Sequence, residues 1–445
     1  GLSIEPVLAD EDELHTFIRA NYGVGGDTLD AMAAGLPDAA KPAAADEMEA
    51  AQEASVVRLV NDILSEAIGE RATDVHIEPY EHDLVVRYRI DGVLQRANVA
   101  STISRFGAAI ISRLKIMANL NIAEKRKPQD GRITFKCRLP GKSPEEFDLR
   151  VSTIPMLFGE GVVLRVLSKA AVLMSLEQLG MPEGVHHAWA GLINRPHGIL
   201  LVTGPTGSGK STTLYASLNK IVSDEIKVIT VEDPVEYHVK GVNQIQVNHQ
   251  VGLDFAAGLR SILRQDPDAI LVGEIRDVET ARIAIQAALT GHFVLSTIHA
   301  TDATSALHRF LDMGIESFLL ASSMLAVVGQ RLIRRNCLEC TAPYEPSLED
   351  LAFYERAGGK PKEVFVRGQG CTVCSGTGYS GRIGVYEVLS VTNEMRELVV
   401  RNAPVDDIRK LAIDQGMVPL RDQALRLVSD DITTIAEVMR TIYIL

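Results

Sequence analysis

The chain has 445 residues, which at about 100–200 residues per domain is enough for two to four domains. Hydrophobic residues make up 46% and charged residues 23%, and 35 Gly and 18 Pro are too few for a fibrous or largely disordered chain. The formal net charge of −13 excludes a global electrostatic attraction to nucleic acid or to an anionic membrane.

The sequence has no membrane-targeting signal. No apolar run approaches the roughly 18 residues that a membrane-spanning helix needs, and the acidic N-terminus lacks a basic-then-apolar leader. We therefore expect a soluble, cytoplasmic, multidomain protein. The chain begins at Gly1 without Met, and we expect a preceding N-terminal part to be missing.

The first 170 residues contain two kinds of pattern. Residues 1–30 resemble the tail of a small folded unit, and the Ala-rich residues 31–54 are typical of a linker. From Val56 an apolar residue recurs every three or four positions, which predicts an amphipathic helix. Residues 84–90 alternate between apolar and polar and run into Asp91-Gly92, a two-residue hairpin signal. Residues 55–170 are thus predicted to form a small α+β domain.

The rest of the chain is predicted to be an α/β domain followed by smaller parts. Short apolar strands at 199–203, 228–231, 269–272 and 293–297 alternate with helical stretches, which indicates a parallel sheet covered on both faces. We assign this domain to residues 171–335. A cysteine-bearing subdomain follows at 336–386, and residues 387–445 are predicted to be the helical end of the α/β domain.

A phosphate loop lies between a predicted strand and a predicted helix. Its sequence is Gly204-Pro-Thr-Gly-Ser-Gly209-Lys210-Ser211, with Thr212 next. The pattern G-x-x-x-x-G-K-S in this context cradles phosphates with backbone N–H groups and the helix N-terminus. The nucleotide-binding residues are therefore predicted to be Gly204, Pro205, Thr206, Gly207, Ser208, Gly209, Lys210, Ser211 and Thr212. Lys210 supplies charge to the β- and γ-phosphates, and the Ser211 hydroxyl is placed to bind Mg²⁺.

Three polar clusters accompany other apolar strands of the same predicted sheet. Glu232-Asp-Pro-Val-Glu236 follows the second strand, Gly273-Glu274 follows the third, and the fourth has His292 before it and His299 after it. Ligands of an open parallel sheet bind at the carboxyl ends of its strands. A carboxylate there can hold Mg²⁺ through water or orient the attacking water. Each cluster alone could equally be structural, but together beside one phosphate loop they indicate function.

Four of the five cysteines form two Cys-x-x-Cys pairs, Cys337/Cys340 and Cys371/Cys374, which are predicted to bind zinc. A fully Cys-ligated site has no open coordination position, so the zinc would be structural. Disulfides are disfavoured in the cytosol. Cys137 stands alone and is expected in the core.

These motifs, in this order, resemble those of the type II secretion and type IV pilus assembly ATPases. Further segments carry the resemblance into the preceding domain: Ala72-Thr-Asp-Val-His-Ile-Glu-Pro79, Gln129-Asp-Gly-Arg132 and Leu149-Arg-Val-Ser-Thr-Ile-Pro155. The resemblance extends over residues 55–445, and residues 1–30 resemble the end of the N-terminal domain by which family members dock to a bitopic membrane protein. It implies an α/β multidomain chain with a RecA-like phosphate-loop motor, a small PAS-like α+β domain before it, a tetracysteine zinc subdomain and C-terminal helices.

The resemblance also implies an assembly and a set of roles. It implies a homohexamer that hydrolyses ATP with Mg²⁺. By position, Glu236 would be the catalytic base, and Glu274 would be the acid of an atypical Walker B segment in which Gly273 replaces the usual Asp. Which glutamate performs which task stays open. His292 and His299 would sense the γ-phosphate or link it to the neighbouring subunit.

Five arginines are candidates for a role at the nucleotide. Arg132 and Arg150 match family positions that close over the phosphates from the α+β domain, where a guanidinium would stabilise transition-state charge. Arg260, Arg264 and Arg276 lie in the motor. Two interpretations of these arginines stay open: contact with the nucleotide of the next subunit, or a surface salt bridge.

The resulting functional hypothesis is a motor that powers pseudopilus assembly in type II secretion from the cytoplasmic face of the inner membrane. Its expected partners are a bitopic inner-membrane assembly protein and a polytopic platform protein, without nucleic acid. The alternatives are a type IV pilus extension ATPase, a RecA-like nucleic-acid motor and a nucleotide-regulated zinc scaffold. The tetracysteine motif argues against a retraction-type pilus ATPase, because those members usually lack it.

Overall fold

The structure is a computed structural model that describes residues 23–25, 28–29, 32, 53–138, 143–168 and 174–442. The predicted docking-domain remnant and linker therefore lie almost wholly outside the described residues. The chain forms two compact units, Gly1–Ala171 and Val172–Leu445, called here the N-terminal and C-terminal units. None of the described helices is long and apolar enough to cross a membrane.

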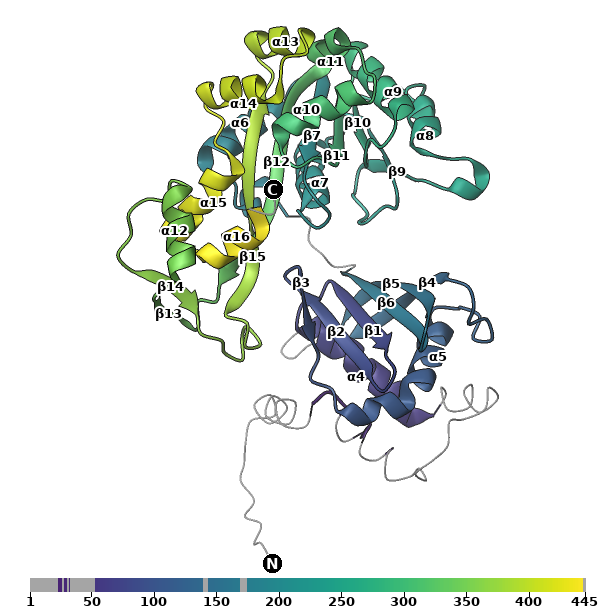
Figure 1. The fold of residues 1–445 in the computed structure, drawn as a ribbon. Helices are drawn as coiled ribbons and strands as arrows, with labels where there is room; N and C mark the ends of the chain where they lie inside the picture. Colours follow the sequence, from purple (N-terminus) through teal and green to yellow (C-terminus); the bar gives the residue numbers. More distant parts are fainter. Residues whose placement is uncertain are drawn as a thin grey trace, which may run out of the picture. The chain divides into compact units, whose positions relative to one another are not determined.

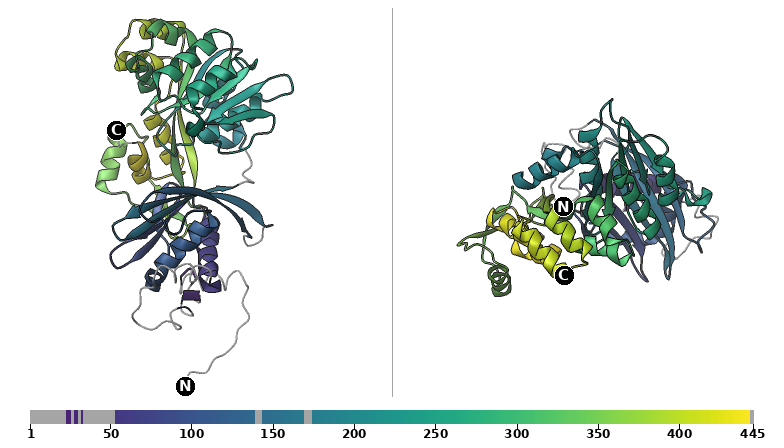
Figure 2. Two further views of the ribbon diagram at one scale, coloured as in Figure 1. Left: turned by 90° about the vertical axis from the view of Figure 1, so that its right-hand side faces the viewer. Right: turned by 90° about the horizontal axis from the view of Figure 1, so that it is seen from above.

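The N-terminal unit is a six-stranded antiparallel sheet with helices on one face (Figure 2). In chain order its elements are α4 (Ala54–Gly69), β1 (Asp74–Pro79), β2 (Leu84–Ile90), β3 (Val93–Arg96), η1 (Ser101–Phe106), α5 (Gly107–Met117), β4 (Gln129–Cys137), β5 (Glu145–Met156) and β6 (Gly159–Ser168). The spatial order of strands is β3-β2-β1-β6-β5-β4. The alternating apolar positions of these strands face α4 and α5 and form one core, which includes Cys137 as predicted.

The hairpin predicted at Asp91-Gly92 is confirmed. Ile90 pairs with Val93, so β2 and β3 are joined by only these two residues. Their φ values are +47° and +85°, the left-handed conformation at both positions that a two-residue primed turn requires.

The C-terminal unit is built on a seven-stranded sheet in the order β15-β12-β7-β11-β10-β8-β9 (Figure 1). Its elements up to the end of the parallel part are η2 (Leu176–Leu179), α6 (Glu183–Ile193), β7 (Gly198–Thr203), α7 (Lys210–Ile221), β8 (Val228–Glu232), β9 (Val242–Gln246), η3 (His249–Val251), α8 (Phe255–Ile262), β10 (Ala269–Val272), α9 (Val278–Leu289), β11 (Phe293–Ile298), α10 (Ala303–Asp312), α11 (Ser317–Ser323) and β12 (Met324–Asn336). The remainder is β13 (Thr341–Tyr344), α12 (Leu348–Arg356), β14 (Phe365–Gly368), β15 (Tyr379–Ser390), α13 (Asn393–Val400), α14 (Val405–Asp414), α15 (Leu420–Ser429) and α16 (Ile435–Ile442).

The four predicted parallel strands are confirmed as β7, β8, β10 and β11, and every residue in them is buried. Successive side chains of β7 enter opposite cores. Ile199 and Leu201 pack in a core with α8 to α11, whereas Leu200 and Val202 pack in a core with α6 and α7. A parallel sheet buried on both faces explains why these strands read as continuous apolar runs rather than alternating ones.

One part of the sequence-based organisation is wrong. The segment beyond Arg335 contains a 12-residue strand, β15, which pairs antiparallel with the 13-residue β12 and belongs to the motor sheet. The predicted boundary between residues 386 and 387 falls inside this strand. The glycines at 378, 381 and 384 hid it, because Gly is depleted in strands. The yellow helices α15 and α16 lie beside this two-stranded part (Figure 1).

Candidate nucleotide site and tetracysteine centre

The phosphate loop connects β7 to α7 at the carboxyl edge of the parallel sheet, as predicted. Gly204, Gly207 and Gly209 have φ of +151°, +79° and +88°, a backbone region that L side chains rarely adopt. The loop also packs closely against β12. A Cβ at Gly209 would stand 2.8 Å from Gln330 Nε2, and one at Gly204 would collide with the Gln330 carbonyl oxygen. The glycines are thus required by both conformation and close packing.

Gln330 is a site residue that the sequence analysis missed. It is 1% exposed, and its Oε1 accepts a hydrogen bond of 2.8 Å from Thr213 Oγ1 on α7. It therefore ties the phosphate helix to β12 beneath the loop. The available signal was a polar residue directly after the apolar run at 324–329.

Lys210 is held over the loop. Its Nζ donates to the carbonyl oxygens of Gly204 (2.8 Å) and Pro205 (3.0 Å). Burial lowers the pKa of Lys210 to about 8; the nearby Arg331 guanidinium adds to this, and the Glu274 carboxylate opposes it. Lys210 is therefore brought together with Glu274, which is 64 positions further along the chain.

The residues of this loop fit a nucleotide phosphate. The Ser208 hydroxyl is buried without a hydrogen-bond partner among the described residues, and Gly207 borders open space. Ser211 is exposed at the start of the 12-residue α7, where backbone N–H groups are unpaired within the helix. The buried Ser208 hydroxyl, the Lys210 ammonium and the N-terminus of α7 all lie around one loop. Together they supply hydrogen-bond donors and positive charge for phosphate oxygens.

Glu274 lies just after the end of β10 and contacts two basic side chains. It forms an ion pair with Arg276, and its Oε2 lies 3.3 Å from Nε2 of His299. The Glu274 side chain is 13% exposed. Gly273 before it has little room for a side chain, because a Cβ there would be 3.3 Å from both the Glu232 Cα and the Val231 carbonyl oxygen.

The two histidines lie at opposite ends of β11. His299 follows the strand's carboxyl end beside Glu274. His292 precedes Phe293, which pairs with Gly198 at the start of β7, and its Nδ1 lies 2.9 Å from the Ala287 carbonyl oxygen. At about 3.3 Å per residue, β11 separates His292 from the phosphate edge by about 20 Å. A role for His292 at the γ-phosphate of its own subunit is therefore wrong; its predicted link to a neighbouring subunit stays a prediction.

Glu236 lies on the connection between β8 and β9. Its backbone N–H donates to the hydroxyl of Tyr215 on α7 (3.2 Å), and the residue is half-buried. Among the motor arginines, Arg276 contacts Glu274, Arg260 pairs with Glu279 of α9, and Arg264 donates to the Arg260 carbonyl oxygen (2.9 Å). Of these three arginines, Arg276 is the one whose contact among the described residues is with a predicted catalytic group.

The two other predicted catalytic arginines belong to the N-terminal unit. Arg132 on β4 pairs in register with Arg150 on β5, and Arg132 Nε lies 3.2 Å from an oxygen of Asp148. Their predicted action at the phosphates stays a prediction.

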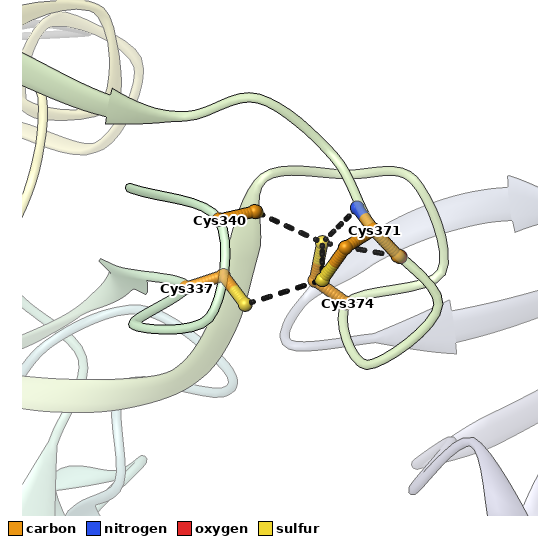
Figure 3. A group of neighbouring side chains, drawn as sticks. All are labelled: Cys337, Cys340, Cys371 and Cys374. Atoms are coloured by element: carbon orange, nitrogen blue, oxygen red, sulfur yellow. Dashed lines mark hydrogen bonds between the residues drawn. The ribbon is translucent and has the colours of Figure 1, made fainter. Parts of the chain in front are cut away.

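The four cysteines converge as predicted (Figure 3). The sulfur pairs Cys337–Cys371, Cys340–Cys374 and Cys371–Cys374 are 3.8, 3.8 and 3.7 Å apart. A tetrahedral zinc with Zn–S bonds of about 2.3 Å places its sulfurs about 3.8 Å apart. The donor set and spacing therefore fit zinc.

Backbone donors favour the thiolate form of Cys374, whereas burial raises the pKa of Cys337 to about 11 and also raises the pKa of Cys340. The N–H groups of Cys371 (3.2 Å) and Gly378 (3.3 Å) donate to Cys374 Sγ, and that of Gly370 donates to Cys340 Sγ (3.3 Å). Burial alone would raise the pKa of Cys374, but these donors outweigh it and lower the pKa to about 7. Gly370, Gly376 and Gly378 have φ of +94°, +77° and +77°, which turns the second cysteine loop back on itself.

Comparisons with known proteins agree with this architecture. The model of the Type II/IV secretion system protein family matches residues 49–440. The type II secretion system protein HxcR of Pseudomonas aeruginosa is 45% identical over 437 residues, 97% of this chain and 88% of that protein. The type IV pilus assembly ATPase PilB of Myxococcus xanthus is 44% identical over 449 aligned positions, 99% of this chain and 78% of that protein.

A solved structure shows the same fold. The crystal structure of the pilus retraction motor PilT with bound ADP matches with a TM-score of 0.54 and 25% identity, covering 85% of this chain and 96% of that one. With the family model spanning most of the chain and relatives above 40% identity over nearly all of it, the chain belongs to the Type II/IV secretion system protein family.

Proposed function

We propose that this chain is a Mg²⁺-dependent ATPase. The observation that carries the proposal is the convergence of Lys210, Glu274 and His299 at the carboxyl edge of the sheet, beside a phosphate loop with a buried, unpartnered Ser208 hydroxyl. The similarity to an ATPase and to a motor solved with ADP supports it.

Each group has a chemical task in this proposal. Lys210 and the loop N–H groups bind the β- and γ-phosphates, while Glu236 accepts a hydrogen bond from the attacking water and orients it. Ser211 and Glu274 would hold Mg²⁺, whose chemistry is to offset charge on the phosphate oxygens. His299 and Arg276 flank Glu274 and hold its carboxylate in place. Arg132 and Arg150 would add positive charge when the N-terminal unit closes.

The proposed work of the enzyme is mechanical. We infer a homohexamer that powers pseudopilus assembly in type II secretion, at the cytoplasmic face of the inner membrane. It would act through a bitopic assembly protein and a polytopic platform protein. The likeness to HxcR supports this reading. The PilB relative is nearly as similar, so type IV pilus extension is the second candidate.

Turnover tests the enzymatic part. The purified chain should release phosphate from ATP only with Mg²⁺, and Glu236→Gln should bind ATP but turn it over at only a small residual rate. Glu225→Gln is the matched control, because Glu225 is exposed on the loop after α7. Equal rates in Glu236→Gln and the control would remove Glu236 from the mechanism. Hydrolysis stimulated by single-stranded DNA would favour the nucleic-acid motor instead.

Secretion and pilus assembly are separated in the cell. A chromosomal Lys210→Ala strain should lose exoproteins from the culture supernatant while its surface pilin stays normal, measured by mass spectrometry. Lys220→Ala, an exposed lysine of the same helix, is the control. Loss of surface pilin with intact exoproteins would make the chain a pilus extension motor.

A further inference from the structure

A buried polar network lies behind Glu236, in a part of the motor to which the proposed chemistry assigns no task. Its centre is the Glu232 carboxylate at the end of β8, which is 5% exposed. Oε2 accepts a hydrogen bond from Tyr215 on α7, and Oε1 accepts from Thr230 Oγ1 (2.6 Å) and Gln244 Nε2 (3.1 Å). Three elements, α7, β8 and β9, thus meet on one carboxylate.

The Tyr215 hydroxyl has a fixed orientation. Tyr215 donates its single hydroxyl proton to the Glu232 carboxylate. The oxygen then offers a lone pair to the N–H of Glu236, which donates to it over 3.2 Å. Burial and the Glu232 charge raise the pKa of Tyr215, which keeps the hydroxyl protonated.

Gln244 holds the residues that follow Glu236. Its Nε2 donates to the Tyr237 carbonyl oxygen (3.0 Å), and its Oε1 accepts from the Val239 N–H (2.8 Å). The Tyr237 ring packs edge-on against the Tyr215 ring at 5.8 Å. The backbone of the Glu236 segment is therefore held on both sides by groups that share Glu232.

We propose that Tyr215 and Gln244, joined through Glu232, are positioning residues for Glu236, an inference that rests on the proposed ATPase function. Tyr215 lies on α7, the helix that begins at Lys210 and includes Ser211. The network therefore fixes the position of Glu236 relative to the helix that carries the proposed phosphate-binding groups. A displaced base would leave nucleotide binding intact and slow the chemical step, since misplacement by about 1 Å can cost about 100-fold.

Tyr215→Phe tests this directly, because it removes one hydroxyl and keeps the ring contact. Its kcat should fall about 10- to 100-fold, while KM for ATP and the Kd for Mg-ADP stay within about twofold. Tyr354→Phe is the matched control: Tyr354 is also buried, and its hydroxyl bonds Ser429 Oγ at 2.9 Å in another core. A Tyr215→Phe rate equal to that of the control would overturn the proposal.

A double mutant shows whether Tyr215 acts through Glu236. In a Glu236→Gln background, adding Tyr215→Phe should cause no further loss of the residual rate, because the group being positioned is gone. A multiplicative further loss would assign Tyr215 some other role and sink the inference. Gln244→Leu should lower kcat in the same way. Full activity of this variant would also contradict the inference.

The same series separates this inference from the proposed function. If Glu236→Gln hydrolyses ATP at the wild-type rate, the proposed base fails and the positioning inference fails with it. If Glu236→Gln is inactive while Tyr215→Phe and Gln244→Leu match the Tyr354→Phe control, the function stands and only the positioning inference is lost.

Discussion

Arg132 and Arg150 stand directly opposite each other on the neighbouring antiparallel strands β4 and β5, and Arg150 is also opposite Arg165 on β6. Like charges directly opposite each other repel, and carboxylates offset part of that repulsion here: Arg132 Nε lies 3.2 Å from an oxygen of Asp148, and Arg165 Nε lies 3.1 Å from an oxygen of Asp74. The row still gathers three guanidinium groups on one face of the sheet, which suits an anionic ligand.

Arg150→Gln should therefore separate function from folding. We expect ATP turnover to fall by at least about 10-fold, while the free energy of unfolding changes by no more than about 0.5 kcal/mol. Steady-state phosphate release and denaturant unfolding measure the two quantities. The control is Arg138→Gln, an exposed arginine of the same unit. Equal turnover in the two variants would show that Arg150 has no role in ATP hydrolysis.

The lowered pKa of Lys210 predicts pH-dependent nucleotide binding. With a pKa of about 8 in the free protein, Lys210 is largely neutral by pH 9, whereas phosphate oxygens favour its charged form. Binding then takes up a proton above pH 8, so the affinity for Mg-ADP should fall by up to about 10-fold per pH unit there.

Calorimetry in two buffers of different ionisation enthalpy measures that proton. Uptake should be near zero at pH 7 and approach one proton at pH 9. Lys210→Ala should bind more weakly and show no uptake from this group. A wild-type uptake that is the same at both pH values would contradict the lowered pKa.

The tetracysteine centre should contain one zinc ion per chain. Its removal by a chelator, or Cys374→Ser, should lower the melting temperature while the Kd for Mg-ADP changes little, because the cysteines belong to a different part of the fold from the phosphate loop. Metal analysis and thermal unfolding are the measurements. Cys137→Ala, in the core of the N-terminal unit, is the control and should keep its zinc. A zinc-free wild-type protein of unchanged stability would refute the assignment.

Glu387 on β15 should be a stability residue. It is buried, and its carboxylate accepts from the first N–H groups of two helices, Ala303 of α10 (2.7 Å) and Leu420 of α15 (3.2 Å). Glu387→Ala leaves both donors without this partner, so we expect a loss of about 2–4 kcal/mol in the free energy of unfolding.

Denaturant unfolding checks this loss against Glu397→Ala. Glu397 is exposed and pairs with Arg401 at 3.6 Å, a surface ion pair whose removal should cost less than about 1 kcal/mol. Similar losses in the two variants would show that the helix ends find other partners.

Several features could be predicted because adjacent residues carry the whole signal. The strand, glycine loop and helix around Lys210 form one contiguous segment, as does the Asp91-Gly92 turn with its φ values of +47° and +85°. The cysteine pairs are similar, since two-residue spacing alone brings two thiols within reach of one ion. The position of His292 could also be predicted from the sequence, because a residue that precedes a parallel strand lies at the edge of the sheet opposite the phosphate loop.

Other features depend on contacts between residues far apart in the chain. Gln330 lies beneath the phosphate loop 117 positions after Thr213, and nothing local marks β12 as the strand beside β7. Tyr215, Glu232 and Gln244 each look like ordinary residues of a helix or strand until their elements pack together. The opposition of Arg132 and Arg150 depends on the register of two strands.

The family, the phosphate loop and the cysteine cluster could be predicted from residue order alone, since these rest on backbone conformations and spacings that a short segment specifies. Which buried side chains lie behind Glu236, and that β15 completes the motor sheet, followed only from the three-dimensional packing. Those outcomes depend on strand order, register and direction, which are set by the simultaneous burial of apolar faces from the whole chain.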